Sequence, residues 1–397
     1  MSDVRIEAVD TRARGLRPRR TVERVSVLEH VRRLDLLLLA AVLGVVGYGL
    51  WAINGITQLD PGGSALSRQG LYAAVGLVAM VAAFFVDPQL YRRFAHVIYV
   101  GLLAMMGLVL ATGAVTRGSR RWIDLGFFRF QPSEFGKVLI ALFLAAYLAN
   151  HGKGIGRLSV PLRAMVLSAG PLLLVFIQPD IGTALVYGAV LAAALFVSGV
   201  RWPHLVAIGG VALLAILAVL WWLPASGVNV LKPYQAQRLT GVFHPSSDPQ
   251  GATYNVNQSI TTVGAGGFRG RGVQGATQTR LDYIPEHGTD FAFASLAEQR
   301  GFVGVAILLL LYLLVVWRGL RVVTSAGDLF GAIVAAGISF AFLFQVYVNV
   351  GMTIGIAPIT GIPLPFVSVG GSSMISNLIA MGILQAIHVR GRRRRAY

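Results

Sequence analysis

The sequence predicts an all-α polytopic membrane protein with about ten transmembrane helices and a large extracytoplasmic loop between the seventh and the eighth. Of its 397 residues, 55% are hydrophobic and only 13% are charged, and the mean hydropathy is +0.68. A soluble domain carries about 25% charged residues. The apolar residues also form long runs, and about 20 such residues in succession cross a bilayer as a helix.

Ten apolar runs predict the positions of these helices. They cover roughly residues 34–55, 70–86, 94–112, 134–150, 162–178, 183–200, 203–223, 301–317, 329–350 and 371–389. The fifth and sixth runs meet at Gln178-Pro179-Asp180, so they form either a tight pair or one broken element. An even number of crossings places both termini on the same side of the membrane.

Basic residues predict which side that is. Residues 1–33 are polar and contain nine arginines, alternate loops add further Lys and Arg, and the chain ends in an arginine-rich segment. Because Lys and Arg gather in cytoplasmic loops, we expect a disordered cytoplasmic tail over 1–33, a transmembrane domain over 34–390 and a basic cytoplasmic C-terminus over 391–397. The net charge of +17 then reflects topology and anionic lipid headgroups. We expect no nucleic-acid partner.

The residue types present exclude several kinds of chemistry. The chain has no cysteine, so it forms no disulfide and has neither a thiolate metal site nor a cysteine nucleophile. The seven histidines are scattered without the spacing of metal ligands. The sequence therefore predicts no metal site built from histidine or cysteine.

A second set of cations departs from the cytoplasmic bias. Its members lie in or beside three outer segments: Arg68, Arg117, Arg120, Arg121, Arg129, Lys137, Lys232, Arg238, Arg269, Arg271, Arg280 and Arg300. The last outer loop has none. This distribution fits either an anionic ligand held at the outer face or ordinary solvation of the loops.

The predicted outer loop covers residues 224–300 and is too long for a simple connection. Loops above about 15 residues are usually functional or disordered. Its glycine-rich stretch VGAGGFRGRG (Val263–Gly272) matches neither G-x-x-x-x-G-K-[ST] nor G-x-G-x-x-G, so it predicts no nucleotide loop. The glycines instead allow tight turns, while Arg269 and Arg271 are candidate anion contacts.

The stretch RGSRRWIDLGFFRFQPSEFGK (Arg117–Lys137) combines cations with an aromatic hairpin-like piece. Pro132-Ser133-Glu134 predicts a helix start with an acid in its first turn. Lys137 lies one turn further on, where an ammonium inside a membrane helix is costly and is a functional candidate. Glu134 and Lys137 share a helix face and can pair. Together with Arg120 and Arg121, Lys137 is suited to clamp a phosphate or pyrophosphate.

Two further stretches place polar groups at membrane depth. Asp180 in FIQPDIGTAL follows a proline, and either caps a helix or takes part in catalysis. In residues 349–377, three prolines interrupt an apolar sequence, and irregular backbone at that depth must be buried in protein or line a cavity. Ser368, Ser372 and Ser373 precede or start the last helix, where they either cap the helix or help its N–H groups to bind an anion.

PEHGTDFAFASLAEQRG (Pro285–Gly301) concentrates acids in a chain that has few. Glu286, Asp290 and Glu298 all precede an apolar run. Glu286 shares a face with Asp290 only if the stretch between them is helical. Glu298 lies next to the membrane span, which indicates a structural role.

These stretches resemble the SEDS family (shape, elongation, division and sporulation) over roughly residues 34–390. The resemblance is carried, in order along the chain, by RRWIDLGFFRFQPSEFGK, QPDIGTAL, YNVNQSI with VGAGGFRGRG, PEHGTDFAFASLAEQRGFVG and GIPLPFVSVGGSS. RFQPSE, YNVNQS and GIPLPF are similar to RodA, the elongation branch. The chain has Val369, Arg271 and Gln299 where the family often has tyrosine, lysine and a second acid.

The resemblance implies a peptidoglycan glycosyltransferase in the bacterial cytoplasmic membrane that polymerises lipid II at its outer face and releases undecaprenyl pyrophosphate. It implies Asp290 as the catalytic aspartate, and a polar cavity with Arg68, Arg121, Glu134 and Lys137. It also implies a class B penicillin-binding protein, a single-span transpeptidase, docked near residues 301–350. A divalent cation, Mg²⁺ or Mn²⁺, stays open.

Elementary chemistry agrees with that implication. Glycosyl transfer from a pyrophosphate needs a base for the attacking hydroxyl, here Asp290, and cations for the leaving group. Glu286 is expected to support Asp290. Two alternatives stay open: a flippase for lipid-linked precursors, which also needs intramembrane charges, and a scaffold that only positions a transpeptidase. A flippase needs anion sites reachable from both leaflets, whereas the unusual cations here favour one face.

Overall fold

The computed structural model describes residues 32–57, 64–116, 119–126, 128–227, 252–284 and 286–395. The chain divides into two units, Met1–Arg33 and Leu34–Tyr397, and all the elements below belong to the second. The predicted disorder of the tail over 1–33 falls almost wholly outside the described residues. So does the middle of the predicted outer loop, residues 228–251.

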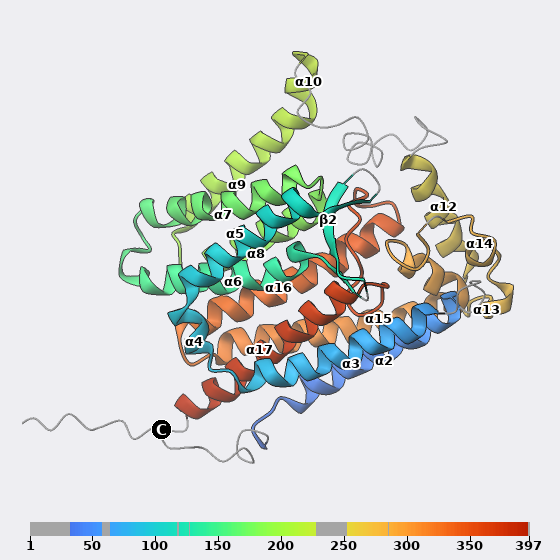
Figure 1. The fold of residues 1–397 in the computed structure, drawn as a ribbon, viewed down its shortest axis with the longest axis horizontal. Coiled ribbons are helices and arrows are strands. Elements are labelled where there is room, and N and C mark those ends of the chain that lie inside the picture. Colours follow the sequence, from blue (N-terminus) through green and yellow to red (C-terminus); the bar gives the residue numbers. More distant parts are fainter. Residues whose placement is uncertain are drawn as a thin grey trace, which may run out of the picture. The chain divides into compact units, whose positions relative to one another are not determined.

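Long apolar helices make up most of the described chain (Figure 1). They are α2 (Leu36–Thr57), α3 (Ser64–Phe85), α5 (Ala95–Thr112), α6 (Pro132–Asn150), α7 (Ser159–Ile177), α8 (Ile181–Val197), α9 (Trp202–Leu217) continued by η2 (Ala218–Trp222) and α10 (Leu223–Ala225), α15 (Ala292–Ser325), α16 (Leu329–Thr353) and α17 (Gly371–Arg395).

Each of the ten predicted ranges overlaps one of these helices, which confirms the predicted all-α polytopic fold class. Within the described residues, nine helices are long and apolar enough to cross a membrane; the tenth, α8, has 17 residues. The fifth and sixth runs form a tight pair, because α7 ends at Ile177 and α8 begins at Ile181. The Asp180 carboxylate caps α8 by accepting a hydrogen bond from the Thr183 N–H at 3.2 Å.

Short elements connect the long helices. They are α4 (Pro88–Arg93), β1 (Ala114–Thr116), β2 (Ser119–Asp124), β3 (Arg129–Phe130), η1 (Gly152–Gly154), α12 (Ala252–Ala265), α13 (Gly272–Gly275) and α14 (Thr277–Arg280). The three strands form one small antiparallel sheet in the order β1-β2-β3. The hairpin-like piece predicted before α6 is therefore present.

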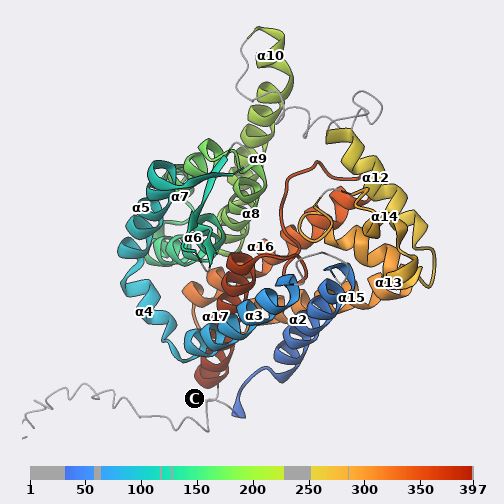
Figure 2. The same ribbon diagram turned by 45° about the vertical axis from the view of Figure 1, so that its right-hand side comes forward.

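The core of the bundle lies around α6, α16 and α17, most of whose residues are buried. Helix α16 packs against α6, α8 and α15, while α17 packs along α3 (Figures 1 and 2). In contrast, no residue of α9 is buried within the chain. Helix α17 also packs against α6, α15 and α16, so these helices share one buried interior.

A break at Gly301 divides α15 into two helices. Gly301 has φ 65° and ψ −165°, a conformation that is essentially restricted to glycine. The glycine-rich stretch crosses the chain at this break: the Phe302 N–H donates to the Gly267 carbonyl at 2.9 Å, and a Cβ on Gly301 would lie 2.2 Å from the Gly270 nitrogen. The glycines of VGAGGFRGRG thus permit a close backbone crossing.

Candidate active site

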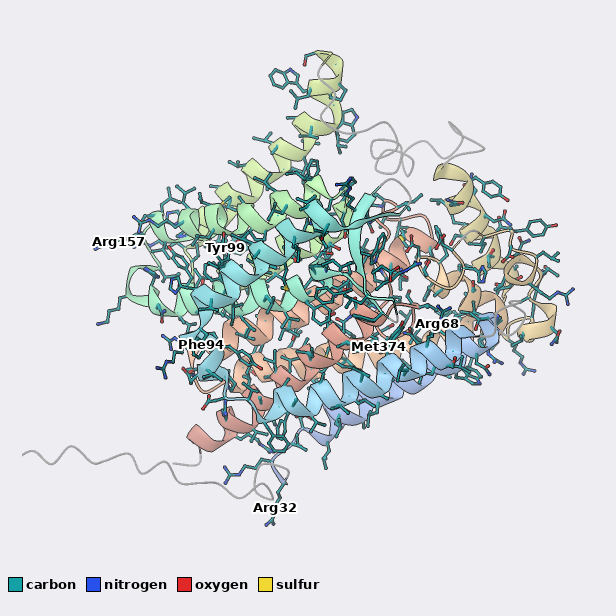
Figure 3. The ribbon with its side chains drawn as sticks, viewed as in Figure 1. Arg32, Arg68, Phe94, Tyr99, Arg157 and Met374 are labelled. Carbon is teal, nitrogen blue, oxygen red and sulfur yellow. The ribbon has the colours of Figure 1, made fainter. Side chains whose placement is uncertain are left out.

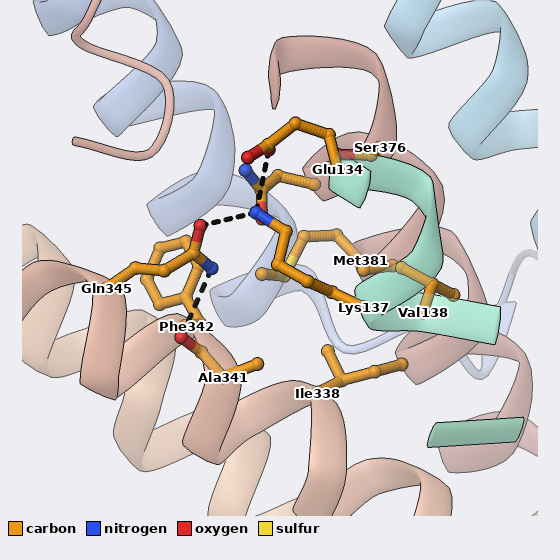
Figure 4. A pocket seen from close by; sticks show the side chains of 11 residues that line it. Glu134, Lys137, Val138, Ile338, Ala341, Phe342, Gln345, Ser376 and Met381 are labelled. Atoms are coloured by element: carbon orange, nitrogen blue, oxygen red, sulfur yellow. Dashed lines mark hydrogen bonds and ion pairs between the residues drawn. The ribbon is translucent and has the colours of Figure 1, made fainter. Parts of the chain in front are cut away.

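A buried ion pair lies at the start of α6. Glu134 is 2% exposed and Lys137 is 5% exposed. The Lys137 ammonium lies 2.7 Å from Glu134 Oε2 and donates to Gln345 Oε1 of α16 at 2.6 Å (Figure 4). The pairing predicted from the three-residue spacing is therefore present. These three side chains line a small pocket together with residues of α16 and α17.

Arg121 holds the turn between α7 and α8 against the start of α6. Its Nε donates to the Gln178 carbonyl at 3.0 Å, and its Nη2 donates to the Pro179 carbonyl. Its Nη1 lies 3.8 Å from Asp180 Oδ1. Asp180 Oδ2 in turn lies 3.4 Å from the Ser133 hydroxyl, next to Glu134. Arg121 and the Glu134–Lys137 pair therefore belong to one polar region.

Asp290 lies half-buried in the turn that precedes α15. Its main-chain carbonyl accepts a hydrogen bond from Asn349 Nδ2 of α16 at 3.0 Å. The irregular segment after α16 passes beside its carboxylate, since a Cβ on Gly361 would lie 3.4 Å from Asp290 Oδ2. Gly361 has φ 69°, which favours glycine. The backbone thus approaches Asp290 where no side chain intervenes.

Ser368 fastens the same segment to the Asp290 turn. Its hydroxyl donates to the Thr289 carbonyl at 2.5 Å and accepts from the Leu364 N–H at 2.8 Å. One residue further on, the Val369 N–H donates to the Gly288 carbonyl at 2.9 Å. Ser368 therefore helps to place Asp290 through the backbone.

The two serines at the start of α17 also bond within the protein. The Ser372 hydroxyl donates to the Arg129 carbonyl at 3.0 Å and accepts from the Gln131 N–H at 2.9 Å. The Ser373 hydroxyl accepts from Asn377 Nδ2 at 3.2 Å. Ser372 thus joins α17 to the strand and loop that lead into α6.

The other two acids of the Asp290 stretch differ in their surroundings. Residues 286–290 form turns, so Glu286 and Asp290 do not share a helix face. Glu286 Oε2 instead accepts from the Thr289 hydroxyl at 2.8 Å. Glu298 is completely buried, and its carboxylate accepts hydrogen bonds from the Gln278 and Thr279 N–H groups, each at 2.9 Å. Glu298 therefore holds α14 against α15.

The remaining predicted cations lie at the periphery. Arg120 is exposed and donates to the Leu110 carbonyl at 3.3 Å. Arg269 and Arg271 are exposed on the glycine-rich stretch, where Arg271 Nε donates to the Ala265 carbonyl at 2.9 Å. Arg68 is exposed near the start of α3 (Figure 3). Its neighbour Gln69 donates to the Ser368 carbonyl at 3.1 Å.

Three site residues were not predicted: Gln69, Gln345 and Asn349. Each is buried, and each bonds to a predicted site residue. The signal was an amide within or beside a membrane span, where a polar side chain needs a hydrogen-bond partner from another helix. Among the described residues, no three His, Asp or Glu side chains converge as a metal-ligand set.

The helices and their polar interior define a multi-pass membrane protein with a charged site between the helices. The chain belongs to the FtsW, RodA and SpoVE family of cell cycle proteins, whose model matches residues 32–393. The resemblance found in the motifs is therefore confirmed.

Relatives with assigned names support this membership. The peptidoglycan glycosyltransferase MrdB of Escherichia coli K12 is 38% identical over 359 residues, which cover 90% of this chain and 94% of MrdB. The stage V sporulation protein E of Bacillus subtilis strain 168 is 36% identical over 353 residues, 88% of this chain and 93% of that protein.

Solved structures match the fold. One belongs to work on the structural coordination of polymerization and crosslinking by a peptidoglycan synthase complex; it is 31% identical, has a TM-score of 0.77 and covers 91% of this chain and 98% of its own. The rod shape determining protein RodA of Thermus thermophilus is 26% identical, has a TM-score of 0.65 and covers 91% of this chain and 97% of its own.

Proposed function

We propose that this chain is a peptidoglycan glycosyltransferase that polymerises lipid II at the outer face of the bacterial cytoplasmic membrane during cell elongation. The observation that carries the proposal is the placement of Asp290 and Lys137. Asp290 is bonded to Asn349, and Lys137 to Gln345, one turn earlier on the same buried helix. The Asp290 contact is made by its main-chain carbonyl and the Lys137 contact by its ammonium, so the turn that carries the base and the cation both meet one face of α16 at residues four apart, about 6 Å along the axis by the helical rise. The name of the relative MrdB supports the same activity.

In the proposed reaction, Asp290 takes the proton from the 4-hydroxyl of an acceptor GlcNAc as that oxygen attacks C1 of the donor MurNAc. A new C1–O bond forms while the bond from C1 to the pyrophosphate oxygen breaks. The electron pair leaves with undecaprenyl pyrophosphate, and the configuration at C1 inverts. A positioned general base contributes typically 10²–10⁴-fold to the rate.

The cations would stabilise the departing pyrophosphate. Lys137 and Arg121 lie in the buried polar region, and we assign Arg68, Arg120, Arg269 and Arg271 to its approach from the outer face. Without substrate, the Lys137 ammonium is paired with the Glu134 carboxylate. An arriving pyrophosphate would compete with Glu134 for the Lys137 ammonium. We assign Glu286 to the support of Asp290, and Ser368, Ser372 and Ser373 to the wall of the site. Positive charge at this position would stabilise the negative charge that develops on the leaving pyrophosphate.

The proposal includes a topology and a partner. Both termini would be cytoplasmic, and residues 224–300 would face outward. A single-span class B penicillin-binding protein would dock near residues 301–350, where α15 and α16 present exposed apolar side chains such as Leu310, Leu313 and Tyr347. The match to a peptidoglycan synthase complex supports this partner.

The test is polymerisation of purified lipid II by the detergent-purified chain, with and without the partner. Wild type should form polymer, and Asp290→Asn should form none while melting at the same temperature. Asp282→Asn is the matched control: Asp282 lies in the same loop, is exposed, and has φ 52°, which asparagine tolerates. Its Oδ1 lies 3.2 Å from His287 Nδ1, and the amide oxygen of asparagine retains that acceptor. It should behave as wild type.

Each other outcome has a consequence. Polymer from both wild type and Asp290→Asn would remove Asp290 as the base and leave the enzyme. If a competent partner is present and neither protein makes polymer, the glycosyltransferase proposal fails. A lipid-translocation assay would then test the flippase alternative.

A further inference from the structure

Helix α16 carries two buried carboxamides four residues apart, Gln345 and Asn349, which are 1% and 0% exposed. Residues with this spacing lie on the same face of a helix, with about 5–6 Å between their Cβ atoms. Gln345 accepts from the Lys137 ammonium at 2.6 Å, and Asn349 donates to the Asp290 carbonyl at 3.0 Å. One face of α16 therefore contacts both halves of the candidate site.

Asn349 joins two segments that are far apart in the sequence. Its Nδ2 donates to the Asp290 carbonyl and also to the Ile362 carbonyl, the latter at 2.7 Å. An amide NH₂ has two hydrogens, so both are used. The turn before α15 and the irregular segment after α16 are thus fixed to one nitrogen.

The two polar atoms of the Asn349 side chain differ in how their hydrogen bonds are satisfied. Its Oδ1 is buried and has no hydrogen-bond partner in the part of the chain that the structure describes. An unsatisfied buried acceptor costs about 1–3 kcal/mol. An apolar residue of similar size would avoid that cost, but it would leave the Asp290 and Ile362 carbonyls without a donor. The side chain is therefore placed for what its nitrogen does.

We propose that Asn349 is the positioning residue for Asp290, and that Asn349 and Gln345 together set the spacing between Asp290 and Lys137. This inference rests on the proposed function of the same site. Asn349 fixes the peptide group between Asp290 and Phe291, which directs the Asp290 side chain. Asn349 itself does not contact the reacting atoms. A displacement of about 1 Å at a reacting group costs on the order of 100-fold in rate.

The test compares Asn349→Asp and Asn349→Leu with wild type across a pH series, using lipid II polymerisation. Both variants should lose about 100-fold in kcat near neutral pH, with KM little changed. The carboxyl introduced by Asn349→Asp has no hydrogen to donate when ionised and one when protonated. Its activity, divided by that of wild type at the same pH, should therefore increase as the pH falls, while Asn349→Leu shows no such recovery. The charged and titratable groups around this face, Asp290, Glu286, His287, Glu134 and Lys137, are present in all three proteins. Asn349→Leu adds no charge beside them, so it shows any change in their own pH dependence that the loss of Asn349 causes.

Asn150→Asp is the control for replacing an asparagine by an acid. Asn150 ends α6, where its Oδ1 accepts from Arg92 Nη2 at 2.6 Å, and an aspartate retains that acceptor. Its pH profile should follow wild type. Unchanged kcat in both Asn349 variants, or a fall that is independent of pH in Asn349→Asp, would overturn the positioning role.

Hydrogen–deuterium exchange gives a measurement that does not depend on enzymatic activity. Peptides covering residues 286–292 should exchange faster in Asn349→Leu than in wild type, whether or not the chain polymerises lipid II. Unchanged exchange there would overturn the inference by itself. Absence of polymer from wild type, with faster exchange in the variant, would overturn the proposed function and leave the structural part of the inference standing.

Discussion

At the scale of single residues, the Glu134–Lys137 pair is costly to bury. Removing two charges from water has a desolvation penalty that their attraction only partly repays. Both side chains are almost fully buried. Within the described residues, the Lys137 ammonium donates hydrogen bonds to two partners, the Glu134 carboxylate and the Gln345 amide oxygen. A well-packed apolar pair would be at least as stable at this position. The pair therefore indicates function rather than stability.

The first residue-scale prediction separates the effect of the Glu134–Lys137 pair on stability from its effect on activity. Lys137→Met should destabilise the chain by about 3–5 kcal/mol, because it leaves Glu134 buried without a cation. The double variant Glu134→Gln, Lys137→Met should recover most of the melting temperature, since no buried charge is left. It should still form no polymer. The measurements are thermal melting in detergent and lipid II polymerisation.

An active double variant would contradict the assignment of Lys137 to the leaving group. A double variant as unstable as Lys137→Met would instead show that the pair stabilises the bundle.

Sequence patterns predicted individual site residues unevenly. Glu134 and Lys137 stand out because a charge in an apolar helix is rare and their spacing is readable. Gln345 and Asn349 are also polar, but their roles depend on Asp290 and Lys137 approaching α16 from distant segments. The link between Glu286 and Asp290 required a helix, and the chain turns there instead. Local spacing is visible in a sequence, whereas a tertiary contact of an amide is not.

At the scale of elements, the irregular segment after α16 depends on a close approach by α2. A Cβ on Gly49 would lie 2.2 Å from the Phe366 carbonyl oxygen and 3.1 Å from Val367 Cα. Phe366 is buried and has φ 66°, an uncommon conformation for a bulky residue. The preceding residue, Pro365, accepts a hydrogen bond from the Tyr312 hydroxyl at 2.6 Å. This backbone has little freedom to move away.

Gly49→Ala and Gly47→Ala are a matched pair on α2. The added methyl of Gly49→Ala should force the segment away from α2 and cost about 1–3 kcal/mol by overpacking. Because this segment also carries Gly361 and Ser368, polymerisation should fall as well. Gly47 has no atom within 4 Å of an added Cβ, so Gly47→Ala should stay within about 0.5 kcal/mol. Melting temperature and polymerisation rate of both variants check this; equal behaviour would show that the approach is not required.

The membrane-spanning helices were more predictable from the sequence than the short helix that precedes the break in α15. The apolar runs located all ten, and the run at 301–317 begins at the Gly301 break that divides α15, but it missed the helix before the break, Ala292–Arg300. This segment, Ala292–Arg300, is helical although it ends in Glu298, Gln299 and Arg300. Glu298 can be buried there because α14 supplies its donors. Hydropathy finds long apolar helices whether they are buried or exposed, and it misses a short helix that ends in charged and polar residues and is covered by a folded loop.

At the scale of the whole molecule, the two ends of the long helices serve different purposes. Asp35, just before α2, accepts from Arg318 Nε of α15 at 2.9 Å, and its main-chain N–H donates to Gln385 Oε1 of α17 at 3.0 Å. This contact joins the ends of α15 and α17 opposite to the ends that carry Asp290 and Ser372. The proposed topology assigns the Asp35 end to the cytoplasm and the Asp290 end to the outer face.

That orientation can be tested directly because the chain contains no cysteine. Thr261 on α12 and Thr324 near the end of α15 are both exposed, and each can be changed to cysteine without a competing thiol. With the positive-inside bias, Thr261→Cys should react with a membrane-impermeant maleimide in intact cells. Thr324→Cys should react only after permeabilisation. The opposite pattern would place Asp290 on the cytoplasmic side, where the proposed outer-face polymerisation could not occur. Labelling of both positions in intact cells would contradict the single membrane crossing that α15 makes between Thr261 and Thr324.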